Sequence, residues 1–225
     1  AAANTLGDPT GLDTDEFDQH VVAHEFLHYL EDAVSRTDTV GGPHSLEERL
    51  DMRVAFSEGL GNAFCAMALG DPLYRDSFGT AQGEDSHFNV ETFVASTPGW
   101  YTEASIHRIL WDLFDGAPDG VDVVTLGFGP LYDVFRSELR TGVPLSSLFP
   151  FITALKQRPG VPASDVERIV QAEQLPGTDF GIVAAGMDAY ASTETHGGGS
   201  TASLPVYASV AVGGRQTVCG DKEEN

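Results

Sequence analysis

The stretch His24-Glu25-Phe26-Leu27-His28 decides the fold of this 225-residue chain. Apolar residues repeat near every 3.6 positions from about residue 15 to residue 34, which predicts an amphipathic helix around the stretch. Residues 13–15, Asp-Thr-Asp, supply its capping signal. Two histidines four positions apart on a helix share one face. Both imidazoles can therefore reach one metal ion, and the pattern predicts a zinc (Zn2+) site.

Glu25 is expected to lie beside this metal without binding it. It sits about 100° around the helix from His24, next to the position that a catalytic zinc keeps open. A carboxylate there can accept a proton from a water that attacks a carbonyl group. We therefore predict that Glu25 is a general base. The competing interpretation is a pair of hydrogen-bonded histidines on an amphipathic helix with no metal.

A second helix is expected after the break at residues 39–43. Ser45 supplies its cap and Glu48 its capping-box partner, and the helix runs towards Leu69 until Gly70 stops it. A short connection allows the two helices to lie side by side. Further helices are expected near residues 100–114, 130–140, 146–157 and 163–174.

The third metal ligand is expected on this second helix. Glu58 lies within the largely apolar run of residues 55–64, where a carboxylate would be costly to bury without a partner cation. Zinc would be that cation. Two alternatives stay open, Asp51 on the same helical face two turns earlier and His44 in the connecting loop.

Residues 20–70 resemble the gluzincin zinc peptidases, especially the fungalysin-like and thermolysin-like branches, in which a second helix carries a glutamate ligand. The metzincin pattern is excluded, because Glu31 and Val34 stand where its glycine and third histidine belong. The resemblance implies a mainly α, zincin-like metallopeptidase core, α+β overall, that hydrolyses peptide bonds in peptide or protein substrates. It also implies the metal ligands His24, His28 and Glu58.

The resemblance implies two further roles near the metal. Relatives often carry an aspartate four residues after the ligand glutamate to orient a histidine; here Asn62 stands there, either orienting that imidazole without a charge or serving as an ordinary helix residue. Relatives also use a downstream histidine or tyrosine to stabilise the oxyanion. Tyr101 is the expected residue, with His107 and Tyr74 as alternatives.

The domain organisation changes near residue 192. Residues 1–191 are expected to form the peptidase domain, with an incomplete version of the sheet that relatives place ahead of the first helix. Residues 192–203, rich in Ser, Thr and Gly, predict a flexible linker. Residues 204–225 alternate at period two around Gly213-Gly214, which predicts a β-hairpin that either pairs with a sheet or starts a further module.

The charge limits the partners. The chain has 34 acidic and 12 basic residues and a formal charge of −22, which repels phosphate backbones and anionic lipid and argues against nucleic acid. No apolar run reaches the roughly 18 residues of a membrane helix. Cys65 and Cys219 are expected to be separate thiols. A chain that begins at Ala1 is expected to be processed, and a secreted or cell-surface location is expected.

Two other functions compete with the peptidase. One is a non-catalytic zinc-binding module of a secreted or surface protein, which keeps the helical scaffold and lacks the oxyanion donor. The other is a zinc-free helical interaction domain, which requires the histidine spacing to be accidental. The sequence predicts no oligomeric state.

Overall fold

A computed structural model describes residues 15–117, 120–142, 144–173, 191–192 and 204–205. Most of these residues are helical, which confirms the expected mainly α class. The α-helices are α1 (Gln19–Val34), α2 (Met52–Leu69), α3 (Glu103–Phe114), α4 (Phe128–Val134), α5 (Leu148–Lys156) and α6 (Ala163–Ala172). The strands are β1 (Leu73–Phe78), β2 (Glu84–Asn89), β3 (Ala191–Ser192) and β4 (Leu204–Pro205).

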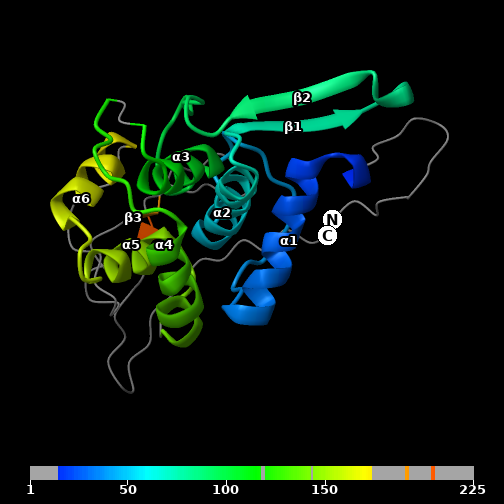
Figure 1. The fold of residues 1–225 in the computed structure, drawn as a ribbon. Helices are drawn as coiled ribbons and strands as arrows, with labels where there is room; N and C mark the ends of the chain where they lie inside the picture. The colour runs from blue at the N-terminus through cyan, green and yellow to red at the C-terminus, as the bar shows by residue number, and fades with distance from the viewer. Residues whose placement is uncertain (1–14, 118–119, 143, 174–190, 193–203, 206–225) are drawn as a thin grey trace, which may run out of the picture.

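Helix α2 lies between α1 and α3 and packs against both (Figure 1). Its residues from Met52 to Ala63 are buried with the single exception of Arg53, so the helix is apolar on nearly every side. Such a helix belongs in the interior of a domain. Glu58 is carried into that interior, where only 8% of its surface stays exposed.

Helix α2 begins later than the sequence predicts. Ser45 is not its cap; residues 45–48 form a single turn closed by the Glu48 amide. The segment that follows is held to the start of α3, because the Leu50 N–H donates to the Tyr101 carbonyl. Asp51 is the true cap and accepts from the Arg53 N–H at 2.9 Å. The predicted end is confirmed, since Gly70 adopts the left-handed conformation at φ 65°.

Helix α1 also begins a little later than expected. A 3-10 turn, η1 (Asp15–Phe17), precedes it, and Asp18 occupies the cap position. The Asp18 carboxylate accepts no helical N–H there; it accepts from the N–H and hydroxyl of Ser77 on β1 at 3.0 and 2.9 Å. The start of α1 is therefore fastened to the strand that follows α2.

The β1–β2 hairpin was not expected from the sequence. Its strands pair antiparallel with Leu73 opposite Asn89 and Phe78 opposite Glu84. The stretches are rich in polar residues and lack apolar alternation, so the usual strand signal is absent. A cross-strand aromatic pair stabilises the hairpin: the rings of Tyr74 and Phe88 stack with centroids 4.7 Å apart.

The remaining helices complete the core on the side of α2 where α3 packs (Figure 1). Their predicted positions are confirmed to within a few residues. Helix α4 continues into a π-helical turn, η3 (Phe135–Leu139). The main apolar cluster joins α2 and α3 to these helices through fully buried side chains, including Phe56, Ile106, Leu110, Phe149 and Phe151.

Some sequence predictions fall largely outside the described residues. The predicted hairpin at 204–225 is described only at Leu204–Pro205, which pairs with Ala191–Ser192. Cys65 is buried with a free thiol, and Cys219 is not among the described residues. Across the described helices, none has the length and apolar character needed to cross a membrane.

Gly59 determines how closely α3 approaches α2. A Cβ placed on Gly59 would lie 2.5 Å from the Cβ of Ile106, closer than real carbon atoms approach. We expect Gly59→Ala to lower the free energy of unfolding by about 1–3 kcal/mol, because the clash can be relieved only by shifting one of the two packed helices. Gly129→Ala on α4 is the matched control, since nothing lies within 4 Å of its added Cβ. Urea unfolding should show the control unchanged or stabilised by up to about 1 kcal/mol; equal effects at both glycines would contradict the close packing.

Candidate metal centre

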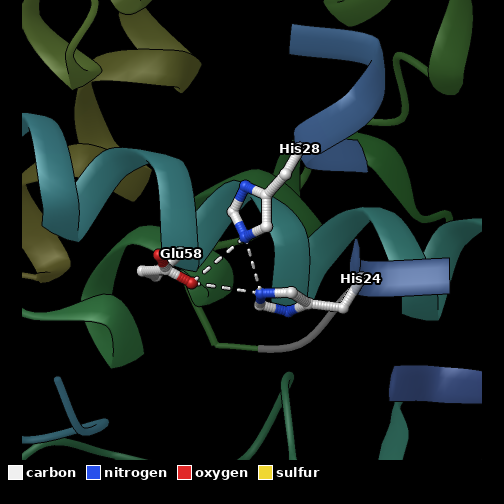
Figure 2. A group of neighbouring side chains, drawn as sticks. All are labelled: His24, His28 and Glu58. Atoms are coloured by element: carbon white, nitrogen blue, oxygen red, sulfur yellow. Dashed lines mark hydrogen bonds and ion pairs between the residues drawn. The ribbon is translucent and has the colours of Figure 1, made fainter. Parts of the chain in front are cut away.

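Three possible ligand atoms meet between α1 and α2. His24 Nε2 lies 3.1 Å from Glu58 Oε2, His28 Nε2 lies 3.3 Å from the same oxygen, and the two Nε2 atoms are 3.1 Å apart. Figure 2 shows both imidazoles reaching from α1 towards the carboxylate on α2. Among the described residues this group could hold a metal ion.

The spacing of these atoms fits zinc. Two ligand atoms about 2.1 Å from a tetrahedral zinc lie about 3.4 Å from each other, close to the three distances observed. Two imidazoles and one carboxylate are also a common set of protein ligands for a catalytic zinc. Three atoms with lone pairs approach so closely only with a proton or a cation among them. The residues present therefore fit the ion that the sequence predicts.

Two buried residues hold the ring of His24 on its Nδ1 side. Its Nδ1 lies 3.0 Å from Asn62 Oδ1, and Asn62 Nδ2 donates to Glu103 Oε2 at 3.2 Å. An ionised carboxylate only accepts hydrogen bonds, so Glu103 fixes the orientation of the amide. The Asn62 oxygen must then accept from His24 Nδ1, which leaves the Nε2 lone pair of His24 for a metal.

The backbone of α2 at Gly61 packs directly against the His24 ring. A Cβ on Gly61 would lie 2.6 Å from Cε1 of His24, so only glycine leaves room for the imidazole against α2. The adjacent Asn62 then meets Nδ1 of the same ring. The run Glu58-Gly-Leu-Gly-Asn62 thus supplies one candidate ligand, the space for the ring of a second candidate, His24, and the hydrogen-bond partner of that ring.

The ring of His28 is fixed in a similar way. Its Nδ1 lies 3.1 Å from Oε2 of Glu31, one turn further along α1. The Ser57 hydroxyl donates to that same carboxylate oxygen at 2.6 Å. With Nδ1 facing Glu31, the Nε2 atom of His28 is the nitrogen that faces Glu58 and His24.

The cluster favours a positive charge among its ligand atoms. Burial lowers the pKa of His28, but hydrogen bonds with Glu31 and Glu58 outweigh burial and raise that pKa to about 10. Burial raises the pKa of Glu58, but hydrogen bonds with His24 and His28 outweigh it and hold that pKa well below its usual range. The two shifts share one electrostatic cause, the attraction between the Glu58 carboxylate and the imidazoles that contact it, and Glu31 adds to the shift of His28.

Glu25 lies on the exposed side of α1. It lies on α1 between the two ligand histidines and is exposed, whereas His24 is buried. It is not among the mutually close atoms that could hold a metal ion. The exposed position leaves Glu25 accessible to water.

His44 is a third imidazole next to the cluster. Its Nδ1 lies 2.7 Å from Glu103 Oε1, and its Nε2 lies 3.6 Å from Glu58 Oε2. The Glu103 hydrogen bond raises the pKa of His44. His44 is not part of the group of mutually close ligand atoms, which favours Glu58 over His44 as the third ligand. Its side chain is 37% exposed, so it faces the cluster from the solvent side.

The other ligand candidate, Asp51, lies outside the cluster. It caps α2 and pairs with Arg53 at 2.8 Å. Both of its carboxylate oxygens accept from the Arg53 guanidinium. The carboxylate of Asp51 therefore stabilises the first turn of α2. Asp51 is not in the group of close ligand atoms.

The three candidates for the oxyanion donor lie in different places. The Tyr101 hydroxyl contacts the Pro98 carbonyl at 3.4 Å, and the Arg49 guanidinium lies over its ring. His107 is fully buried and stacks on Phe88, and burial lowers its pKa to about 3. Tyr74 is the one whose ring contacts a ligand, with its centroid 6.3 Å from that of His24.

Two buried carboxylates at the site were not singled out from the sequence. Glu31 could have been found, because it lies three residues after His28 and seven after His24, on the same face of α1. Glu103 had no such signal, since it reaches the site from α3 through tertiary packing. No family model, curated protein or solved structure matches the chain. The chemistry of the centre therefore has to be inferred from its own residues.

Proposed function

We propose that the chain is a zinc-dependent peptidase in which His24, His28 and Glu58 hold the metal and Glu25 is the general base. One observation carries the proposal: two Nε2 atoms and one carboxylate oxygen converge within 3.3 Å of one another, and Glu25, which lies between the two histidines on the same helix, stays exposed. A purely structural metal site would have little use for an accessible carboxylate at that position.

Each residue has a defined task in this proposal. Zinc, when bound, supplies a Lewis acid that polarises the peptide carbonyl and makes water more acidic. Glu25 accepts the proton of the attacking water and can return it to the leaving amine. The three ligands lie on two packed helices, which holds the site in a fixed geometry.

We assign support of the oxyanion to His44 in this proposal. The sequence favoured Tyr101, but its contacts are with Arg49 and Pro98. His44 lies against the ligand Glu58 from the exposed side, and Glu103 holds its ring through Nδ1. A hydrogen-bond donor held by a buried carboxylate is suited to stabilising a developing negative charge.

Digestion of a peptide library tests the proposal. We expect the zinc-loaded chain to cleave peptides, a chelator to abolish the cleavage, and added zinc to restore it. Mass spectrometry of the products gives the cut positions, and chelated protein in excess calcium controls for loss of other divalent ions. Zinc binding without any cleavage would contradict the peptidase and favour a non-catalytic zinc-binding module.

A further inference from the structure

Glu31 is a buried carboxylate that no strong cation neutralises directly. It is 2% exposed, and its described partners are His28 Nδ1 at 3.1 Å and the Ser57 hydroxyl at 2.6 Å. No arginine or lysine among the described residues pairs with it in a salt bridge. Burying an ionised carboxylate is costly unless a positive charge lies close by.

A divalent metal would supply that charge. A cation held by Glu58 and two neutral imidazoles retains one positive charge, because Glu58 balances only half of it. Glu31, which contacts the other nitrogen of the His28 ring, balances the remaining positive charge. The two carboxylates and the ion would form an electrically neutral group, which lowers the cost of placing all three in the interior.

The two ligand histidines differ in how their charge partners reach them. On its Nδ1 side, away from Glu58, His24 reaches a carboxylate only through the amide of Asn62, which donates to Glu103. His28 meets Glu31 directly. A carboxylate that accepts from a ligand imidazole fixes its ring orientation and makes its other nitrogen a stronger donor to the metal.

We propose that Glu31 is the positioning residue of the metal centre, which holds His28 by Nδ1, makes its Nε2 a stronger metal ligand and completes the charge balance. Ser57 assists by fixing the carboxylate from α2. This inference rests on the metal-binding part of the proposed function and is independent of peptide hydrolysis.

Glu31→Gln tests this role because it keeps the size of the side chain and an oxygen that can accept from His28. We expect zinc to bind about 10–100-fold more weakly, measured by competition with a chromophoric chelator. The melting temperature of the metal-free protein should change little compared with that loss. The absorption spectrum of bound Co2+ should shift, because it reports the ligand field at the metal and not the stability of the fold.

Two variants provide comparison. Asp32→Asn removes the same charge from the exposed neighbouring position of α1 and should leave both the zinc affinity and the Co2+ spectrum unchanged. Ser57→Ala keeps the charge of Glu31 and should cost only a few-fold in affinity, since it removes one fixing hydrogen bond.

The outcomes separate this inference from the proposed function. Tight zinc binding by the wild type with an equal affinity and spectrum for Glu31→Gln would overturn the role of Glu31 and leave the three ligands in place. A melting temperature that falls without any change in the Co2+ spectrum would show a structural role only. A wild type that binds no zinc would overturn both.

Discussion

Glu25→Gln is expected to lower peptide hydrolysis about a thousandfold or more while zinc content and folding stay nearly unchanged. The substitution keeps the size and shape of the side chain, but an amide cannot accept the proton of the attacking water. Glu25 is exposed and is not among the candidate ligand atoms, so the substitution should leave metal binding unchanged. The ratio of kcat/KM for wild type and variant, with zinc measured in the same samples, gives the effect.

Glu48→Gln is the matched control for this loss. It makes the same chemical change at an exposed glutamate in the segment before α2 that is not one of the grouped candidate ligands. Its turnover should equal that of the wild type, which shows that a general loss of surface charge is not the cause. Equal turnover by wild type and Glu25→Gln would rule out the general base.

The group of residues that could hold a metal was predictable from the sequence, because the signals of its members are local. The spacing of His24 and His28 fixes their shared face once the segment is helical, and helicity follows from the apolar period. Glu58 was predictable for an energetic reason, since a carboxylate in an apolar helix requires a cation. Its 8% exposure and its contacts with both histidines agree with that reasoning.

The surroundings of the ligands were not predictable, because they depend on tertiary packing. Glu103 orients Asn62 and His44 from a helix more than forty residues further along the chain. Helix α2 begins at Met52 and not just after Ser45, because the segment before it hydrogen-bonds to the residues around the start of α3. These tertiary contacts override the local capping box at Ser45. The β1–β2 hairpin escaped prediction because its pairing depends on register and on one aromatic stack.

Glu58→Ala is expected to empty the metal site. The ligand set would fall to two histidines on one helix, and nothing from α2 would then hold the ion in place. The variant also leaves His24 and His28 without the carboxylate that they both contact. Zinc affinity should fall by at least about a thousandfold, because metal binding depends on the complete ligand set.

Asp51→Ala separates the ligand from another carboxylate on the same helix. Asp51 caps α2, so its loss should lower the free energy of unfolding by about 1 kcal/mol without emptying the site. If Asp51→Ala lost zinc and Glu58→Ala retained it, the ligand assignment would be reversed.

The zinc content per chain, measured after dialysis against zinc-free buffer, tests the ligand assignment most directly. We predict about one zinc per chain for wild type and Asp51→Ala, and less than roughly a tenth of that for Glu58→Ala. A wild-type chain that carries no zinc, and whose stability responds neither to added zinc nor to a chelator, would contradict the metal centre itself.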